Sequence, residues 1–432
     1  MNKINLGLIG YGNVGSGVVK FLQTRANYFR NKFHTEFVLK TICDRSTRDK
    51  NFSGLGDVQA TTDINQVLND PSIDVVIELI GGIHPAKEIV LGALKNGKHV
   101  VTANKELLAH HAQELFREVH KRDKNIYFES SVMAGVPVIS MLTHGIAGNV
   151  VSRLYGIING TCNFILTEMT KNDCTFSQAL EKAQKKGFAE ANPKLDISGM
   201  DSAHKLAILT SLTLGKFLKI EDIYTEGITH ISHVDIEHAE SMNLTIKLLG
   251  IAKRVENAIE ARVHPTLISK DHPLASINGI YNALFLSTEP LGDILISGEG
   301  AGQMAAASGV ISDLLNLASR TGSEASNMLG NLYTEAPDRK VTKIDEIKTR
   351  FYLRFIATDK PGVLSTITGI LGKHGISINS VTQKAHIRRS TVPVIMLTDY
   401  APEKNLRIAL EKIFRLSIVK SMPVAIRMEN LS

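Results

Sequence analysis

A stretch in the middle of the chain, GFAEANPKLDISGMDSAHK at residues 187–205, combines several carboxylates with a lysine. Its acidic residues are Glu190, Asp196 and Asp201, and it ends at Lys205. Carboxylates can bind an ammonium group and a lysine can transfer a proton, so the stretch could bind and convert an amino compound. However, Asp201 and Lys205 also have the i,i+4 spacing of an ordinary helical ion pair, worth only about 0.3–0.5 kcal/mol. The stretch alone does not decide between these two interpretations.

A second chemical signal is the glycine-rich sequence Gly10-Tyr11-Gly12-Asn13-Val14-Gly15. It follows a predicted strand at residues 4–9 and opens a helix that we predict from Val14 to about Thr24. Gly10 would allow a tight turn, Gly12 the approach of a pyrophosphate, and Gly15 the packing of the helix on the strand. The free N–H groups and positive dipole end of the helix would attract the phosphates. The motif predicts dinucleotide binding; the alternative is a glycine-rich turn that serves only packing.

The choice of dinucleotide depends on Cys43-Asp44-Arg45-Ser46, at the end of the second predicted strand. Asp44 would hold a ribose 2′-hydroxyl, as in NAD, whereas Arg45 would favour the 2′-phosphate of NADP. The sequence offers both residues, so NAD and NADP both remain open. Asp44 also follows Gly15 by more than the usual distance of about 20 residues. We therefore expect a longer connection around residues 28–37.

The elements that must position these residues alternate between strand and helix in the first half of the chain. The apolar runs are INLGLIG, EFVLKTIC, IDVVIELIG, KHVVTAN and NIYFES, and the helical stretches include AKEIVLGALKNG and KELLAHHAQELFREVHKR. This alternation predicts an α/β fold with a Rossmann-type, doubly wound parallel sheet. From about Val150, longer amphipathic helices (FSQALEKAQKKG, DSAHKLAILTSLTLG) occur with strands such as NALFLST and GDILISG. These predict a second, α+β domain.

The last part of the chain forms a separate pattern. A polar segment at residues 333–348 is predicted to be a linker, and the residues after it follow the order βαββαβ of a ferredoxin-like domain. We expect a dinucleotide-binding domain at residues 1–135, to which residues 305–325 return. A second domain is expected at 136–332 and the ferredoxin-like domain at 349–432.

Bulk properties exclude several other classes of protein. With 432 residues, 43% hydrophobic and 21% charged, the chain fits a globular protein of two or three domains. The net charge of +6 is spread along the chain, so we expect no nucleic-acid partner. No apolar run approaches the roughly 20 residues that span a membrane. The three cysteines, Cys43, Cys162 and Cys174, show no CxxC spacing, and no signal peptide is recognisable, so we expect a reducing, cytoplasmic location.

Histidine-rich stretches give no convincing metal site. His230, His233 and His238 have a spacing that fits no standard site, and we expect them to be polar surface residues. The adjacent His110 and His111 cannot share one face of a helix.

Several further stretches make the chain resemble homoserine dehydrogenase in unbroken order over about residues 3–330. They are VVIELIGG (75–82), TANKELLA (102–109), FESSVMAGVPVI (128–139), GIINGTCNFILT (156–167), GFAEANPKLDISGMDSAHKLAIL (187–209) and TEGI (225–228). HPLASINGIYNALF (272–285) and GEGAGQMAAASGVISDL (298–314) match more loosely. The C-terminal domain, with Asp359-Lys360-Pro361-Gly362-Val363-Leu364, resembles an ACT domain, as in the longer, threonine-inhibited members of this family.

The resemblance implies oxidation of L-homoserine or reduction of L-aspartate 4-semialdehyde in threonine and methionine biosynthesis. That reaction needs anionic groups for the substrate ammonium and one acid/base for the hydroxyl oxygen. By resemblance, Lys205 moves the proton, Asp201 orients it, and Glu190 and Asp196 bind the substrate. Lysine in water has a pKa of about 10.4 and nearby carboxylates favour its charged form, so we expect oxidation to be faster at higher pH. Glu181 is expected to be an ordinary residue of the preceding helix.

Other roles are also implied by resemblance. Lys105 would contact both cofactor and substrate, the N–H groups of Gly160 and Thr161 would receive the substrate carboxylate, and Gly302 would approach the nicotinamide. A sodium ion would be bound by main-chain oxygens of four residues, Glu129, Val132, Ala134 and Val136. Threonine would bind the C-terminal domain at Asp359, Gly362, Val363 and Asn379. A homodimer or homotetramer, associated through the second domain, is also implied.

Three positions depart from the family pattern. Cys43 stands where arginine is frequent, SVMAGVP replaces a more glycine-rich loop, and GEGAGQMAAAS lacks the usual proline and threonine. Two alternatives therefore stay open. The chain could be a non-catalytic amino-acid sensor, or a Rossmann dehydrogenase for a related amino acid. An acylating semialdehyde enzyme would need a nucleophile, for which Cys162 is the nearby candidate, and no histidine partner is evident.

Overall fold

The computed structural model describes residues 1–46, 56–122, 124–319, 339–383 and 391–431. The chain divides into two compact units. The first contains residues 1–160, 203–223 and 280–339, and the second contains residues 161–202, 224–279 and 340–432. Each unit is described by itself. The expected 349–432 domain and the strip around Glu190, as far as Ser202, lie in the same, second unit.

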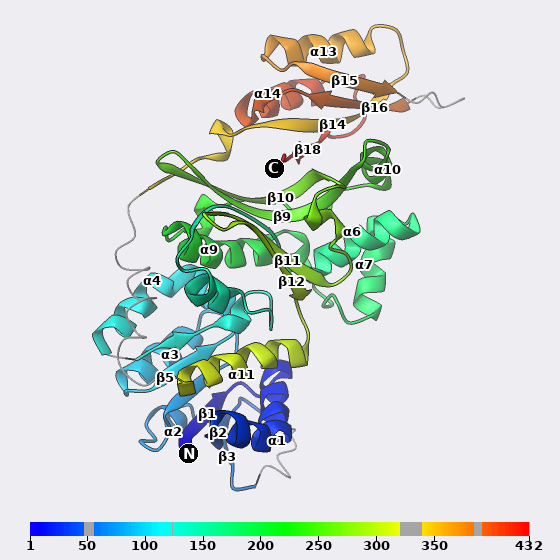
Figure 1. Ribbon diagram of the computed structural model, residues 1–432. Helices are drawn as coiled ribbons and strands as arrows, with labels where there is room; N and C mark the ends of the chain where they lie inside the picture. The colour runs from blue at the N-terminus through cyan, green and yellow to red at the C-terminus, as the bar shows by residue number, and fades with distance from the viewer. Residues whose placement is uncertain (47–55, 123, 320–338, 384–390, 432) are drawn as a thin grey trace. The chain divides into compact units, whose positions relative to one another are not determined.

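A six-stranded parallel sheet forms the base of the first unit (Figure 1), with the strand order β3-β2-β1-β4-β5-β6. Its strands are β1 (Asn2–Ile9), β2 (Thr35–Cys43), β3 (Gln59–Thr61), β4 (Val75–Glu78), β5 (His99–Thr102) and β6 (Ile126–Tyr127). All neighbouring strands are parallel. This is the order of a doubly wound dinucleotide-binding fold, and it confirms the predicted fold class.

Helices cover both faces of this sheet. They are α1 (Asn13–Phe33), α2 (Asn65–Leu68), α3 (Ala86–Lys95), α4 (Lys105–Arg122) and α11 (Gln303–Ser319). On one face, Leu6 and Leu8 of β1 pack in a buried core with α1 and α11. On the other face, a Cβ on Gly7 would lie only 2.5 Å from Val67 of α2. A segment from late in the sequence, α11, is thus part of the nucleotide-binding core.

The first helix is longer than its sequence pattern indicates. We predicted an end near Thr24 and a long connection afterwards, but α1 continues to Phe33 and β2 begins at Thr35. Phe29 is buried against Phe37, which explains why the helix continues past its first apolar stripe. His34 ends the helix in the left-handed conformation. The extra residues before Asp44 therefore lie in helix and not in a loop.

Three antiparallel strands complete the first unit: β7 (Val150–Ile157), β11 (Tyr281–Glu289) and β12 (Gly292–Glu299). Short helical turns lead from β6 to β7, namely η1 (Glu129–Ser131), α5 (Val138–Ser140) and η2 (Met141–Gly145), and a further turn, η3 (Ile220–Asp222), follows α9. Helix α9 (Met200–Leu214) begins in the second unit and continues in the first.

The second unit is built on a sheet with the strand order β9-β10-β18-β14-β16-β15. These strands are β9 (Leu244–Val255), β10 (Ala258–Ser269), β18 (Val424–Met428), β14 (Lys348–Thr358), β16 (Thr391–Thr398) and β15 (Ile378–Gln383). One edge of β10 pairs in turn with β13 (Lys340–Val341), β8 (Tyr224–Thr225) and β18. The sheet of the ferredoxin-like domain is therefore continuous with the hairpin β9–β10. A further short strand is β17 (Ala401–Pro402).

The helices of the second unit fall into two groups. Near the strip 187–205 lie α6 (Gly160–Asn172), α7 (Phe176–Lys185) and α8 (Lys194–Ile197), and elsewhere α10 (His233–Ser241), η4 (Pro273–Ser276) and η5 (Ile344–Glu346). In the C-terminal part, α13 (Val363–Lys373) and α14 (Glu403–Phe414) cover one face of the strands β14 and β16 (Figure 1). The order of elements confirms βαββαβ. Of the predicted linker, residues 333–338 lie outside the described residues.

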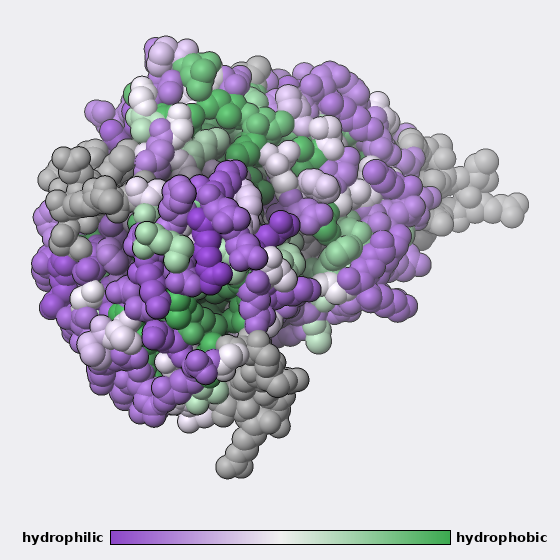
Figure 2. Space-filling model, turned by 60° about the horizontal axis from the view of Figure 1, so that its bottom comes forward, coloured by the Kyte–Doolittle hydropathy of each residue, from purple (hydrophilic) through white to green (hydrophobic). Residues whose placement is uncertain are grey.

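The surface is mainly hydrophilic on the face shown in Figure 2, where hydrophobic colour occurs in patches between polar side chains. Among the described residues, no helix is long and apolar enough to cross a membrane.

Candidate active site

The glycine-rich turn between β1 and α1 leaves its backbone open at one position. A Cβ on Gly10 would lie 2.7 Å from the carbonyl of Leu79, and one on Gly15 would lie 2.1 Å from the carbonyl oxygen of Gly10. Gly10 also has a φ of +101°, which favours glycine. By contrast, no atom lies within 4 Å of the Cβ position of Gly12, which is the N-cap of α1. The turn therefore fits a dinucleotide: two glycines make it tight, and the third leaves room for phosphates.

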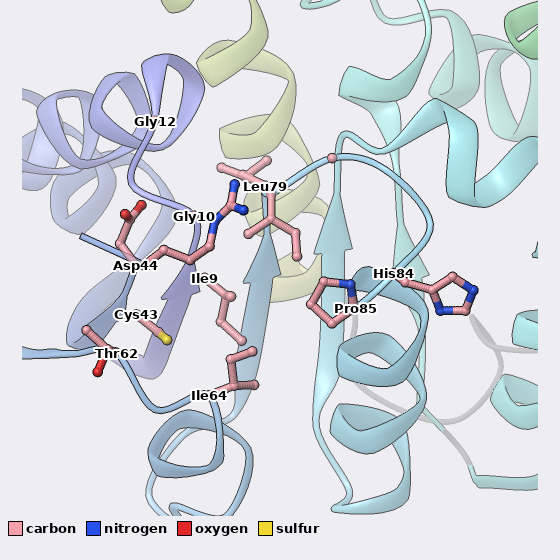
Figure 3. Close-up of a pocket in the computed structure, with 13 residues that line it drawn as sticks. Ile9, Gly10, Gly12, Cys43, Asp44, Thr62, Ile64, Leu79, His84 and Pro85 are labelled. Carbon is pink, nitrogen blue, oxygen red and sulfur yellow. The ribbon is translucent and has the colours of Figure 1, made fainter. Parts of the chain in front are cut away.

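A cavity of about 330 Å³ opens beside this turn (Figure 3). Gly10, Gly12, Asp44 and Arg45 line it on one side, and the residues on the other side are Leu79, Ile80, Gly81, His84 and Pro85. The carboxylate of Asp44 accepts hydrogen bonds from the backbone N–H of Tyr11 (2.7 Å) and of Ser46 (3.1 Å). Asp44 thus ties the end of β2 to the glycine-rich turn. Asn13 and Val14 form the first residues of α1.

The start of α11 reaches the same turn. The side-chain amide of Gln303 donates to the hydroxyl of Ser16 (3.0 Å), and this hydroxyl donates to the carbonyl of Gly12 (2.8 Å). Gly302, with a φ of +122°, directly precedes α11 and has open space at its Cβ position. The structure therefore brings the two glycine-rich segments together, although they are almost 290 residues apart. Sequence reasoning missed Gln303 and Ser16, because neither belongs to a motif.

Lys105 begins α4 just beyond the carboxyl end of β5. A network of buried hydrogen bonds holds the carboxyl end of this strand in place. The fully buried carboxylate of Glu78 accepts from the hydroxyl of Thr102 (2.6 Å) and from the N–H of Ile80 (2.9 Å). Asn104 caps the helix through the N–H of Leu107 (3.0 Å) and donates to the carbonyl of Gly82 (2.7 Å). Burial raises the pKa of Glu78. These supporting residues were not predicted.

The ammonium of Lys205 lies at the turn between β7 and α6. Its Nζ donates to the carbonyl of Ile158 at 2.8 Å. Asn159 follows and is buried, and Gly160 is the first residue of α6. A Cβ on Gly160 would lie 2.8 Å from the carbonyl oxygen of Ile280, so the turn requires glycine. The predicted proton donor and the predicted carboxylate-binding turn therefore meet in the first unit.

The carboxylates of the strip differ in exposure. Asp201 is 4% exposed, Asp196 is half-buried and Glu190 is exposed. The hydroxyl of Thr161 donates to the carbonyl of Phe188 (2.6 Å), so it anchors the strip to α6. Glu190 and Asp196 belong to the second unit and Lys205 to the first, so their joint action stays a prediction. Glu181 lies on α7 and pairs with Lys185 (2.6 Å) on an exposed surface.

The loop predicted to bind a cation turns sharply between η1 and α5. Met133 and Ala134 both have left-handed backbone conformations, with φ of 56° and 53°. The carboxylate of Glu129 is buried and accepts from the N–H groups of Ile139 (2.7 Å) and Ser140 (2.8 Å). Among the described residues, no cluster of three or more His, Cys, Asp or Glu side chains could hold a metal ion. A cation here would need carbonyl oxygens, including those of Val132 and Val136.

The predicted effector residues fall at two places in the ferredoxin-like domain. Gly362, with a φ of +87°, is the N-cap of α13, and Val363 begins the helix. Asp359 directly follows β14, and the amide of Gln383, at the end of β15, lies 3.4 Å from its carboxylate oxygen. Asn379 lies at a register shift near the start of β15. Because β14 and β15 both run antiparallel to β16, Asn379 and Asp359 lie at opposite ends of these strands within one chain, and their joint binding of one effector stays a prediction.

The histidines expected at the surface are only partly there. His230 and His233 are half-buried and lie 3.1 Å from Glu226 and 2.8 Å from Asp173, whereas His238 is buried, so the expected surface position was wrong for it. Cys162 is fully buried and its thiol donates to the carbonyl of Asp196 (3.2 Å). A buried thiol that serves as a donor to the strip is poorly placed as an acylation nucleophile.

Comparisons with known proteins agree with this geometry. Family models match residues 10–129 (homoserine dehydrogenase, NAD-binding domain), 137–315 (homoserine dehydrogenase) and 351–415 (ACT domain). A homoserine dehydrogenase of Synechocystis sp. is 38% identical over 431 residues, which cover 98% of this chain and 99% of that protein. A solved homoserine dehydrogenase from Thiobacillus denitrificans has a TM-score of 0.91 at 38% identity and covers 100% of this chain and 99% of its own. A hyperthermophilic archaeal homoserine dehydrogenase in complex with NADPH has a TM-score of 0.63 at 27% identity, with coverage of 73% and 97%.

Proposed function

The chain belongs to the homoserine dehydrogenase family, and on this premise we propose that it interconverts L-homoserine and L-aspartate 4-semialdehyde. It is an oxidoreductase that uses a nicotinamide dinucleotide. The single observation that carries the proposal is the hydrogen bond between Lys205 and the carbonyl of Ile158. It supports a site in which a proton-transferring lysine lies beside a helix start that can bind a carboxylate.

Lys205 would transfer the proton at the substrate oxygen. In reduction, its ammonium donates to the aldehyde oxygen while the carbonyl carbon receives hydride, and in oxidation the neutral amine accepts the hydroxyl proton. Asp201, one helical turn earlier on α9, would orient the lysine. Because a neutral amine is needed for oxidation, we expect oxidation to be favoured at higher pH.

The substrate would be bound through its two charged ends. Glu190 and Asp196 would accept hydrogen bonds from its ammonium. The N–H groups of Gly160 and Thr161, at the start of α6, have no partner within the helix and would donate to its carboxylate. Lys105, at the start of α4, would contact both substrate and cofactor.

The cofactor would be held by the turn between β1 and α1, with Gly12, Asn13 and Val14 at its phosphates. The nicotinamide ring, when bound, gives or accepts the hydride. Gly302 would lie near that ring. Asp44 and Arg45 line the cavity in which the ribose would lie, so we propose that both NAD and NADP are accepted.

The activity is tested by following oxidation of NADPH and of NADH with aspartate 4-semialdehyde. Activity with neither cofactor would refute the proposal, and so would equal activity with semialdehydes that lack the α-ammonium group. The second candidate in the same class, a dehydrogenase for a related amino acid, predicts a higher kcat/KM with the semialdehyde of a different amino acid. A non-catalytic sensor predicts no turnover at all, but threonine binding.

Three finer proposals follow from the same family. A sodium ion would be bound by carbonyl oxygens of Glu129, Val132, Ala134 and Val136, where two left-handed residues turn the backbone. Activity measured in sodium, potassium and tetramethylammonium salts at equal ionic strength tests this. L-threonine would inhibit through Asp359, Gly362, Val363 and Asn379. The chain would form a homodimer or homotetramer through residues 136–332, which mass measurement in solution tests.

The domain ranges stay a proposal as well. We retain a nucleotide-binding domain at 1–135 with residues 305–325, a catalytic domain at 136–332, a linker at 333–348 and a regulatory domain at 349–432. The position of α11 beside α1 supports the return of residues 305–319 to the first domain. Residues 320–325 lie outside the described residues.

A further inference from the structure

A second cavity, of about 520 Å³, lies in the second unit between α14 and the segments around β8 and β18. None of the predicted effector residues lines it. Ligand sites are commonly clefts of about 300–1,000 Å³ that combine apolar walls with a few polar groups. The size and lining of this cavity meet that description.

Helix α14 presents two parallel rows of side chains to this cavity. Glu403, Arg407 and Glu411 follow one another at i,i+4 spacing, and they form a row of alternating charge. Leu406, Leu410 and Phe414 form the adjacent apolar row with the same spacing. The opposite wall is also apolar, formed by residues 422–425. The phenyl ring of Phe414 is 47% exposed and Met422 is 73% exposed, so the apolar wall is open to water at its rim.

The floor of the cavity is a buried ionic cluster around Arg427. Its guanidinium donates to Glu403 (2.6 and 2.9 Å), to Glu226 (2.7 Å) and to the hydroxyl of Tyr224 (2.9 Å). Tyr224 donates in turn to Glu226 (2.7 Å), and His230 lies 3.1 Å from the same carboxylate. Burial alone would raise the pKa of Glu226, but His230 and Arg427 hold it well below its usual value. The floor is therefore a charged, hydrogen-bonded surface under an apolar wall.

Glu226 also connects this floor to the substrate strip. The next residues, Gly227 and Ile228, pack backbone to backbone on residues 197–199. The N–H of Ile228 donates to the carbonyl of Ile197 (3.0 Å), and a Cβ on Gly227 would lie 2.0 Å from that carbonyl oxygen. Gly199 in turn approaches the carbonyl of Glu226, with its Cβ position 3.2 Å away. No side chain separates the two segments, so a shift of Glu226 must move the residues between Asp196 and Asp201.

We propose that this cavity binds a free α-amino acid with an apolar side chain, and that binding alters the substrate strip through Glu226. The alternating row on α14 offers carboxylates to the ligand's ammonium and Arg407 to its carboxylate, while the leucines and Phe414 receive the side chain. Three carboxylates and two guanidinium groups line the cavity, and Arg407 is also bound to Asp345 (2.6 Å). This surplus of negative charge favours a ligand with an ammonium group over a simple carboxylic acid.

Binding is tested with the full-length chain carrying Phe414→Trp. The chain contains no tryptophan, so the introduced indole is the sole tryptophan reporter. We expect saturable changes in its emission with L-isoleucine, L-leucine or L-methionine as probes. Glu411→Lys in the reporter background should weaken binding by at least about tenfold. Lys412→Glu is the matched control, because this neighbour does not line the cavity, and it should leave affinity unchanged.

Three results would overturn the binding proposal. The first is the absence of any saturable change in emission, together with an unchanged Tm of the wild type, with all three probes. The second is binding that Asn379→Ala abolishes and Glu411→Lys leaves intact, because the ligand would then bind at a predicted effector residue outside this cavity. The third is an emission change that follows protein concentration and not the probe, because a second copy of the chain would then cover the groove.

The coupling to the strip rests on the proposed function and needs its own readout. We expect saturating probe to change the KM for homoserine in the wild type and in Lys412→Glu, and to have no effect in Glu411→Lys. An unchanged KM at saturating probe would refute the coupling, while the fluorescence titration would still report binding. If the chain proved inactive with homoserine, the titration would be unaffected, so failure of the activity and failure of the new site are distinguishable.

Discussion

Lys205 and Ile158 are joined by a hydrogen bond of 2.8 Å from the ammonium to the main-chain carbonyl. Ile158 comes two residues before Gly160, the first residue of α6. The lysine is therefore positioned by the backbone of the same turn whose N–H groups would bind the substrate carboxylate. Such an arrangement would help to fix the distance between proton donor and substrate, together with the orienting role proposed for Asp201.

Replacement of this lysine should mainly affect the chemical step. We expect Lys205→Ala to lower kcat by about 10²–10⁴-fold, because general acid–base catalysis contributes this range, with a smaller change in KM for aspartate 4-semialdehyde. Lys185→Ala, which removes an exposed lysine paired with Glu181, is the control and should keep full activity. A near-normal kcat in Lys205→Ala would assign the proton transfer to another group.

The exposed carboxylate of the strip should act on substrate affinity. We expect Glu190→Gln to raise the KM for homoserine by about 10–100-fold, because a charge-assisted hydrogen bond to the ammonium is worth about 1.5–3 kcal/mol. Glu181→Gln makes the same chemical change on the neighbouring helix and should have no effect on the steady-state kinetics. Equal effects of both variants would indicate a general electrostatic influence instead of direct binding.

Cofactor preference should respond in opposite directions to two adjacent substitutions. Asp44→Ser removes the acceptor expected at the ribose 2′-hydroxyl and also the hydrogen bond to Tyr11, so kcat/KM for NADH should fall by about tenfold. Arg45→Ser should instead lower kcat/KM for NADPH. The ratio of the two efficiencies is the measurement, and a parallel loss in both variants would contradict separate roles.

The buried carboxylate of Glu78 makes a prediction about stability and pH. Burial raises its pKa in the folded state above the ordinary value of 4.5. As pH rises past that value, the unfolded chain loses this proton first, so Glu78 makes the free energy of unfolding fall, by at most about 1.4 kcal/mol per pH unit. Glu78→Gln cannot ionise and should flatten this slope in urea unfolding experiments. An unchanged slope would show that other groups determine it.

Threonine inhibition should depend on the edge of the ferredoxin-like domain. We expect Asn379→Ala to raise the threonine concentration for half-inhibition by about tenfold, because the amide would lose a direct hydrogen bond to the effector. Ser380→Ala, at the next residue of β15, should leave inhibition intact. If wild-type activity is insensitive to threonine, the C-terminal domain has a different role.

Local patterns predicted the repetitive parts of this molecule well. The strands of the parallel sheet and the turn at Gly10 and Gly12 have short-range signals, namely continuous apolar runs and a glycine spacing, and both are present. The predicted end of α1 near Thr24 was wrong, because Phe29 stabilises the extra turns of the helix through a contact with Phe37 on the next strand. A helix end set by tertiary packing has no local signal.

Long-range pairings explain what could not be predicted. Gln303 meets Ser16 only because α11 folds back onto α1. Glu78 and Thr102 come from different strands, and only the parallel register brings them together. The Arg427 cluster joins residues about 200 positions apart, and of these Glu226 belongs to the family stretch TEGI. No local sequence pattern indicates which of these residues contact one another.

The edge of β10, shared by β13, β8 and β18, bears on how this protein can be studied. Deleting residues 345–432 to separate regulation from catalysis would remove β18, the partner of Thr266 and Leu267, from a strand of twelve residues whose interior is largely buried. Unpaired, apolar strand edges recruit other chains, so a truncated enzyme should tend to aggregate. In such a fragment, loss of threonine sensitivity could not be distinguished from an effect of aggregation. Point substitutions in the intact chain avoid this problem.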